Sequence, residues 1–435
     1  MFQKLNASIG EITLRRILAL VLASTLVPCL SVAWAFVEFS GSPNPVGSGA
    51  RALGMGGAFI AVADDATAAS WNPGGLIQLE TPEISVVGAG LYRVEDNTLG
   101  KHPEGSGAEY ANNWNLNFLS FTYPFRVLER DMVVSLSYQH LFDFNRNWNW
   151  TLNFDSSHTR IKNHYQQDGG LYAWGVAYCA QLLPTLSMGF TLNIWDDGFY
   201  DNGWREEFSY TARSRGYGVQ RVQRIDEYSF SGFNANLGLL WSATDRLSFG
   251  AVFKTPFTGD LTHHYFKYDS GSVRTRSKKT DEELDMPMSY GLGVAYQPLE
   301  HVTLSADVYR TDWQDFILTK QGGAKVSGVN GLPSKKADID ATTQVRVGAE
   351  YLFAKPRYTI PLRAGLFYDP GPARGSPDAY YGCSIGSGIG IGRFVLDFAY
   401  QYRFGRNVTS AVYENMDFHQ DVDEHTLYSS LIIHF

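Results

Sequence analysis

Cysteine is scarce in this sequence. Only three of the 435 residues are cysteine, at positions 29, 179 and 383. Small exported domains that depend on disulfides carry cysteine densely, so this spacing excludes a disulfide framework. Cys179 and Cys383 both lie in strand-like stretches, and we expect them to be free, packed thiols.

Long apolar runs and charge are also limited. After residue 35 no stretch is long and apolar enough for a transmembrane helix, and charged residues make up 18% of the chain. The formal net charge of -8 argues against a nucleic-acid partner. Aromatic residues, at 14%, and the 43 glycines are plentiful instead. A chain that enters a membrane without spanning helices must pair its backbone between strands, and a closed barrel does so without an edge.

Signatures of catalysis are missing. The chain has no Gly-Lys-Ser/Thr phosphate loop and no serine elbow. His263 and His264, and also His425 and His434, lack the paired spacing of a metal site, and we expect them to be solvated. We therefore predict no enzyme, no catalytic residues, no metal and no cofactor; an outer-membrane phospholipase is a distant alternative.

The first 35 residues are typical of a secretory signal peptide. Basic residues precede an apolar run over 17–27, and Ala-Trp-Ala follows at 33–35. The run ends at Pro28 after about eleven residues, well short of the ~20 that a spanning helix needs. We expect cleavage before Phe36 and export to the bacterial outer membrane.

Segments with period-two alternation recur along the rest of the chain. Fourteen of them, an even number as single-chain bacterial barrels require, are found near 83–92, 112–123, 131–144, 170–182, 185–196, 227–241, 246–254, 287–298, 301–312, 343–353, 359–368, 382–391, 392–404 and 425–435. The sequence therefore predicts an all-β fold over 81–435, a transmembrane antiparallel β-barrel of 14 strands.

The connections between these segments alternate in length. Short ones include 124–130, 183–184, 242–245, 299–300 and 354–358. Long ones are 93–111, 145–169, 197–226, 255–286, 313–342, 369–381 and 405–424. Outer-membrane barrels have short periplasmic turns and long external loops, so we expect the long connections to face outside.

One strand shows the alternation clearly. Over 393–404, Phe394, Leu396 and Phe398 share one face, which we expect to meet lipid, while Asp397 and Arg403 share the luminal face. A soluble sandwich also alternates, so this pattern alone leaves both folds open. The last strand, 427–435, ends in phenylalanine and resembles the C-terminal strand that the outer-membrane assembly machinery recognises. We expect that machinery and outer-membrane lipid to be partners.

Residues 36–80 precede the first strand and are rich in small residues. They include 49–65 and Asn72-Pro73, a turn starter in which proline fixes φ. Small residues permit tight backbone packing. We expect this segment to lie inside the barrel as a hatch, or plug, with Arg51, Asn72, Pro73 and Gly74 as hatch or gate residues.

The chain resembles the FadL/TodX family of outer-membrane transporters for long-chain fatty acids and aromatic hydrocarbons. The resemblance covers nearly the whole mature chain, and its matching stretches are 38–40, 49–52, 56–58, 63–65, 72–73, 304–308, 311–313, 347–351, 362–366, Tyr368 and Pro370. One departure is Asn72-Pro73-Gly74, where the family commonly has Asn-Pro-Ala.

The resemblance implies a fourteen-stranded barrel closed by the hatch. Ligand would be captured in a groove between outer loops, here 197–226 and 255–286, and would move to an apolar pocket against the mature N-terminus. It would leave sideways into the membrane through a gap at an inward kink of the third strand, near 131–144. This route suits a lipid ligand, because apolar chains gain by staying out of water.

Several residues are candidates for ligand contact. Phe36 and Phe39 near the new N-terminus are predicted to fill the internal pocket until ligand displaces them, or simply to pack the hatch. Trp204 and Phe208 belong to an aromatic cluster in loop 197–226 that suits a capture groove, a packed loop cap or an interfacial belt.

Arg346 and Arg363 face the lumen on neighbouring strands. A guanidinium group matches a carboxylate, so both are candidates for binding a fatty-acid head group. The alternative is a luminal ion-pair network, for which Glu350, Asp307 and Asp397 are ready partners.

Two functions from different classes remain open. One is diffusion of long-chain fatty acids or other hydrophobic small molecules through a hatch-gated barrel. The other is a non-transporting FadL-like barrel that acts as a scaffold or carrier for surface or secreted proteins. A water-filled porin is disfavoured, because a hatch would block the lumen.

Overall fold

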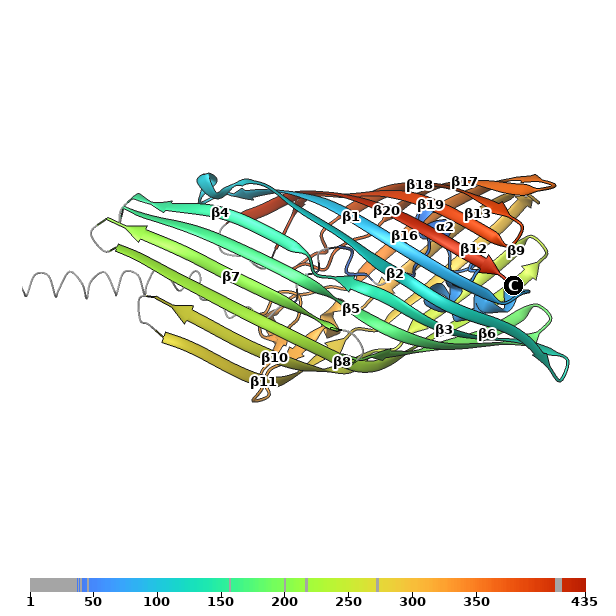
Figure 1. Ribbon diagram of the computed structural model, residues 1–435, viewed down its shortest axis with the longest axis horizontal. Helices are drawn as coiled ribbons and strands as arrows, with labels where there is room; N and C mark the ends of the chain where they lie inside the picture. Colours follow the sequence, from blue (N-terminus) through green and yellow to red (C-terminus); the bar gives the residue numbers. More distant parts are fainter. Residues whose placement is uncertain are drawn as a thin grey trace, which may run out of the picture.

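The computed structural model describes residues 37, 39, 41–44, 47–155, 158–198, 201–215, 218–270, 274–410 and 417–435. The predicted signal peptide and Phe36 lie outside this part of the chain. The described residues form a closed antiparallel barrel of 14 strands, which confirms the predicted fold (Figure 1).

Four of the fourteen barrel positions consist of two consecutive strands separated by a short break. Around the barrel the strands are β1 (Glu83–Leu99), β2 (Gly107–Val127), β3 (Arg130–Asp143) with β4 (Arg146–Phe154), β5 (Thr159–Leu183), β6 (Leu186–Trp195) with β7 (Gly203–Ser214), β8 (Gly218–Thr244), β9 (Leu247–Lys254) with β10 (Phe257–Asp269), β11 (Arg274–Met286) with β12 (Ser289–Leu299), β13 (Val302–Thr311), β16 (Thr342–Lys355), β17 (Tyr358–Tyr368), β18 (Tyr380–Ile391), β19 (Phe394–Val408) and β20 (Phe418–His434). Two short strands, β14 (Ile317–Thr319) and β15 (Lys325–Ser327), lie between β13 and β16.

The ring closes between the first and last strands. β1 pairs with β20 from Glu83 opposite His434 to Leu99 opposite Phe418. This pairing leaves no free edge where the first and last strands meet, and within a membrane an unpaired backbone group would have no water to bond.

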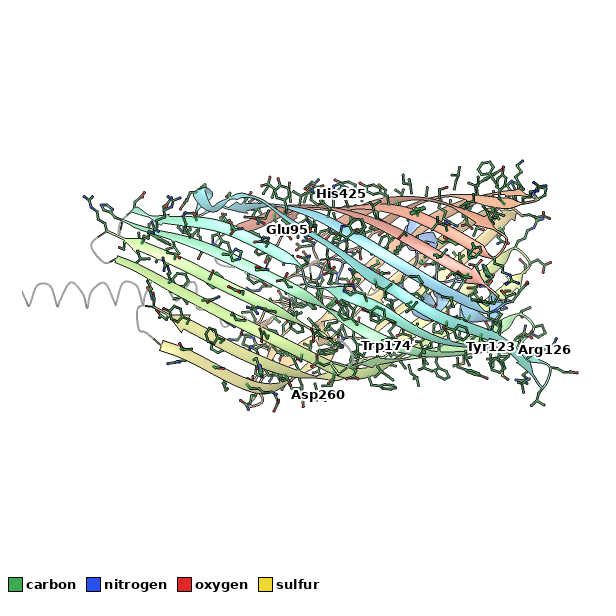
Figure 2. All side chains as sticks on the ribbon, in the orientation of Figure 1. Glu95, Tyr123, Arg126, Trp174, Asp260 and His425 are labelled. Atoms are coloured by element: carbon green, nitrogen blue, oxygen red, sulfur yellow. The ribbon has the colours of Figure 1, made fainter. Side chains whose placement is uncertain are left out.

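The outer surface of the barrel carries the apolar face of each strand. Phe394 and Phe398 are more than half exposed, whereas Asp397 between them is buried in the lumen, as the alternation predicts. Figure 2 shows Tyr123 and Trp174 on the same outer surface. Cys179 is buried as expected, but Cys383 is exposed on the outer surface, so that thiol is not packed. No helix in the described residues is long and apolar enough to cross a membrane.

The strands extend far beyond their predicted ends. Most of 93–111, 145–169, 197–226, 255–286 and 405–424, predicted as loops, is β-strand, in β1, β2, β4, β5, β7, β8, β10, β11, β19 and β20. We call one end of the barrel the outer lobe. It consists of β4, β7, β10, β11 and the adjoining ends of β1, β2, β5, β8 and β20. The strand prediction failed there because the outer face of the lobe is polar, as at Lys279 and Asp281. The sequence therefore lacks the alternation of apolar and polar residues, although the backbones of neighbouring strands still pair.

An N-terminal segment, residues 47–79, lies inside the barrel. It contains α2 (Ala50–Gly54), α3 (Ala68–Trp71) and the 3-10 helix η2 (Pro73–Gln78), and nearly all of its side chains are buried. It sits near the end of the barrel where the chain terminates (Figure 1). Three further 3-10 turns, η3 (Pro103–Gly105), η5 (Trp313–Asp315) and η6 (Ser334–Lys336), lie in connections between strands.

Candidate ligand chamber and lateral opening

The N-terminal segment rests directly on the backbone of the barrel wall. The Asn72 side chain donates to the carbonyl oxygens of Ile60 and Leu239 at 2.8 and 2.9 Å and accepts from the Gly74 amide at 3.0 Å. A Cβ on Gly74 would lie 2.9 Å from the Gly238 carbonyl oxygen. This close approach explains why residue 74 is glycine in this chain, whereas the family commonly has alanine at this position.

Ion pairs tie the same segment to the wall. Arg51 donates to Glu350 at 3.0 Å and pairs with Asp64. Burial opposes the charge of Arg51, but the carboxylates of Asp64 and Glu350 outweigh it and raise the pKa of this guanidinium. Arg363 pairs with both Glu350 and Asp397 at 2.6 Å. The structure thus places Arg363 in the luminal ion-pair network that the sequence offered as its alternative role.

Arg346, the other luminal candidate, contacts the N-terminal segment. Its Nη1 donates to the Gly56 carbonyl at 2.8 Å, and its Nη2 lies 3.6 Å from Asp369. Asp307, on the neighbouring strand, accepts from the Phe59 and Ile60 amides at 2.6 and 2.9 Å. Arg346 also lines a cavity, which is described below.

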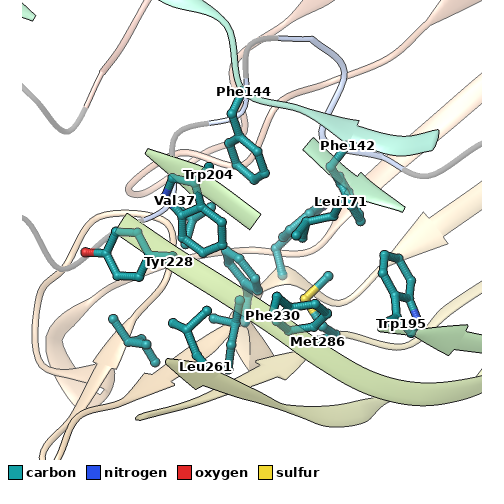
Figure 3. Close-up of a cluster of buried hydrophobic side chains, with 14 of the residues drawn as sticks. Val37, Phe142, Phe144, Leu171, Trp195, Trp204, Tyr228, Phe230, Leu261 and Met286 are labelled. Carbon is teal, nitrogen blue, oxygen red and sulfur yellow. The ribbon is translucent and has the colours of Figure 1, made fainter. Parts of the chain in front are cut away.

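A cluster of buried apolar side chains, which we call the apolar chamber, is drawn in Figure 3. Buried side chains from many strands form it: Val37, Phe142, Phe144, Leu171, Ala173, Trp195, Trp204, Tyr228, Phe230, Leu261, Leu284, Met286, Trp313, Phe316, Leu318, Ala337 and Ile339.

Phe39 occupies this chamber. Four aromatic rings surround its phenyl ring, with centroids at 4.9 Å for Phe142, 5.5 Å for Phe144, 5.9 Å for Trp313 and 5.7 Å for Phe316. The structure therefore packs the Phe39 ring in this cluster, a position compatible with both predicted roles, filling a ligand pocket and packing the N-terminal segment.

A column of stacked rings continues from Phe144 into the outer lobe. Trp204 stacks on Phe144 at 4.8 Å and on Tyr228 at 4.5 Å, and Tyr228 stacks on His263 at 4.4 Å. Trp204 is therefore a chamber residue on strand β7, not part of a capture loop. Phe208 faces a separate outer cluster with Trp150 and Tyr210, so the two predicted partners lie in different clusters.

The two segments expected to form a capture groove consist mainly of β-strands. The segments 197–226 and 255–286 are hairpins that pair with each other through β8 and β10, from Ser231 opposite Asp260 to Val222 opposite Asp269. His263 was predicted to be solvated, and this prediction is wrong. Its side chain is largely buried and lies 2.8 Å from Asp226 and 3.4 Å from Glu282. Burial disfavours its charged form, but these two carboxylates raise the pKa of His263 to about 9.

A chain of alternating buried charges runs beside the chamber. In order, it links Arg146, Glu95, Arg93, Glu424, Arg403, Asp369 and Arg346 through ion pairs. Arg93, Arg146 and Arg403 line a cavity of about 370 Å³ that Val37 and Phe39 also border. Sequence reasoning named Arg346 as a ligand candidate and placed Arg403 in the lumen, but it did not find this chain of charges, because most of its ion pairs join residues distant in the sequence.

The third barrel position is broken between β3 and β4, where the resemblance implied an inward kink. The β2–β3 ladder ends at Phe118 opposite Gln139, and the β3–β5 register shifts between His140 and Phe142. A cavity of about 160 Å³ lies at this break, lined among others by Asn117, His140 and Arg346. No group of three His, Cys, Asp or Glu side chains in the described ranges is arranged to hold a metal.

The model of the outer membrane protein transport protein family (OMPP1/FadL/TodX) matches residues 44–409. No curated protein matches the chain.

Solved structures share the fold. A Pseudomonas aeruginosa FadL homologue is 16% identical with a TM-score of 0.64, covering 91% of this chain and 100% of its own. The Pseudomonas putida toluene transporter TodX is 14% identical with a TM-score of 0.58, covering 92% and 100%. The Ralstonia pickettii toluene transporter TbuX is 15% identical with a TM-score of 0.53, covering 90% and 99%. The chain therefore belongs to the FadL/TodX family of outer membrane transport proteins, and its barrel is an outer-membrane barrel.

Proposed function

We propose that the protein passes amphipathic hydrophobic compounds with an acidic head group, long-chain fatty acids first among them, by diffusion through the barrel. The observation that carries the proposal is the position of Phe39. Its ring fills an aromatic chamber and borders a cavity lined by three buried arginines. An acyl chain in place of Phe39 gains apolar burial, at about 25 cal/mol per Å².

The charge chain supports an acidic head group. It begins and ends with arginine, so its ion pairs join four guanidinium groups through three carboxylates. A ligand carboxylate at Arg146 would continue the alternation, and hydrogen bonds between ionised partners are about twice as strong as neutral ones. Arg146 also lies within reach of the Phe39 carbonyl oxygen, at 3.4 Å, so one residue connects the head-group cavity to the displaceable segment.

The N-terminal segment acts as a hatch in this proposal. Residues 47–79 stay bound to the wall through Asn72 and Arg51, and only the stretch around Val37 and Phe39 moves when ligand enters. Ligand then leaves through the break between β3 and β4. The toluene transporters among the similar structures make neutral aromatic hydrocarbons the competing ligand class.

The test compares oleate with oleyl alcohol, which differ at the head group. We expect Arg146→Gln to weaken oleate binding to the purified barrel at least about tenfold, because a charged hydrogen bond is lost. Oleyl alcohol binding should not change. Arg146→Lys retains the charge and should retain most of the affinity for oleate, and exposed Arg205→Gln is the matched control. Equal losses for both ligands, or tight binding of toluene alone, would contradict an acidic head group.

Extraction of small molecules from the purified barrel, analysed by mass spectrometry, separates transport from scaffolding. Bound long-chain acids whose amount changes when residues 36–40 are deleted support transport. An empty barrel in both forms, with a protein co-purifying on the outer lobe, favours the scaffold.

A further inference from the structure

One boundary in the outer lobe lacks a backbone ladder. In the described residues, β4 pairs with β5 along Arg146–Phe154 but has no ladder with β2 on its other side. Residues 107–117 of β2 likewise pair with β1 alone. The two strands face each other along a seam that rises from the break between β3 and β4.

Side chains hold this seam closed. Asn113 Nδ2 donates to both carboxylate oxygens of Asp143, at 3.0 and 2.8 Å, and Asn145 Nδ2 donates to the Asn112 carbonyl oxygen at 2.6 Å.

Two glutamates extend the seam outward. The backbone amide of Asn149 donates to the Glu109 carboxylate at 2.7 Å, and the backbone amide of Asn153 donates to the Glu104 carboxylate at 2.8 Å. Each glutamate takes the place of the carbonyl acceptor that a neighbouring strand would have provided.

These contacts are easier to break than a ladder. A ladder forms cooperatively between two backbones, whereas each seam contact is a separate hydrogen bond to a side chain. The two glutamate bonds are also exposed to solvent, so water competes for their donors and acceptors. Inside the lobe, Arg146 and Trp148 of β4 also bond Glu95 of β1. Parting the seam therefore breaks these contacts as well, whereas the β1–β2 and β4–β5 ladders stay intact.

The foot of the seam meets the cavity at the strand break. Asn115 and Asn117 of β2 and Phe142 and Asp143 of β3 line that cavity, and Phe142 contacts Phe39 in the chamber. Parting β2 from β4 would therefore enlarge the cavity at the strand break, beside the chamber.

We propose that Glu104 and Glu109 form a latch, and that release of this latch extends the lateral opening upward between β2 and β4. The inference rests on the proposed function for its consequence, the passage of ligand. Both glutamates are positioning residues: they set how often the seam is open and do not contact ligand.

The first experiment locks the seam. Glu109→Cys with Asn149→Cys, in a Cys383→Ser background, is joined by a short reducible thiol–thiol cross-linker. We expect cellular uptake of labelled oleate to fall at least about tenfold, because the cross-link holds the opening shut, and to return on reduction, which cuts the cross-link. Asp96→Cys with Ala108→Cys, joined across the existing β1–β2 ladder, is the control and should not change uptake. Normal uptake through a fully cross-linked seam would overturn the proposal.

The second experiment releases the latch. Glu104→Ala with Glu109→Ala should raise uptake, whereas the double glutamine variant keeps an acceptor oxygen at each site and should stay near the wild type. Spin labels at Ala108 and Thr151 report the opening without any ligand. A second, longer distance that becomes more populated in the alanine variant supports the latch, and a single distance that alanine does not alter overturns it.

The two proposals fail differently. Absence of oleate binding by the wild type would count against the proposed function, while the spin-label distances still decide whether the seam opens.

Discussion

The side chain of Asn72 lies directly against Gly238 of β8. A Cβ on Gly238 would lie 2.1 Å from Asn72 Oδ1 and 2.8 Å from the Pro73 nitrogen. The turn that begins at Asn72 therefore docks on a wall position where only a hydrogen atom fits. The Asn-Pro-Gly turn and the wall glycine form one structural unit although they are far apart in the sequence.

Gly238→Ala should destabilise the barrel by about 1–3 kcal/mol, since overpacking forces Asn72 out of its hydrogen bonds. The temperature at which the folded band is lost in gel electrophoresis measures this. Gly107→Ala is the control, because a Cβ there meets nothing within 4 Å. Equal shifts for the two variants would contradict the close docking of the turn.

Glu350→Gln should cost about 2–3 kcal/mol, because Glu350 is buried and accepts from both Arg51 and Arg363. Urea unfolding of the folded barrel checks this value. Glu227→Gln, which breaks an exposed pair with Arg205, should cost less than about 1 kcal/mol. A smaller loss for Glu350 than for Glu227 would show that Arg51 does not depend on this carboxylate.

Phe39→Ala should tighten oleate binding by roughly tenfold, because ligand no longer has to displace the phenyl ring from the chamber. Titration of the purified barrel with oleate measures the change. Phe154→Ala, in the outer cluster, is the control and should leave the affinity as it is. Weaker binding by Phe39→Ala would mean that the ring forms part of the ligand site instead of occupying it.

His263 makes the stability of the outer lobe depend on pH. Its pKa is raised to about 9 by Asp226 and Glu282, so its contribution is complete below pH ~6.5 and is lost as pH rises through 9. The loss amounts to at most about 3 kcal/mol. Hydrogen exchange of the β10 amides between pH 6 and 10, corrected for intrinsic rates, should show destabilisation in the wild type and a much flatter profile in His263→Gln. A constant difference between the two proteins across this range would refute the charged pair.

The barrel itself was predictable from the sequence. Side chains on a strand alternate between its two faces whatever the rest of the chain does. Phe394 and Asp397 therefore indicate which face of their strand meets lipid and which faces the lumen. Small residues around 49–65 likewise indicated a tightly packed segment, and the structure places that segment inside the barrel.

Local sequence patterns failed to predict the strands of the outer lobe. In the outer lobe both faces of a hairpin such as β10–β11 tolerate polar residues, so apolar alternation disappears while the ladder persists. For this reason Trp204 and His263 were predicted to lie in loops, although both lie on strands and are largely buried.

The sequence by itself determined the fold class, the number of barrel strands and the family, because these depend on period-two patterning and on motifs in order. Only the tertiary structure decided the site. The chain of charges from Arg146 to Arg346, the contact of Asn72 with Gly238 and the seam at Glu109 all join residues distant in sequence. Ring closure and strand register bring such residues together, and no local pattern encodes which of them will meet.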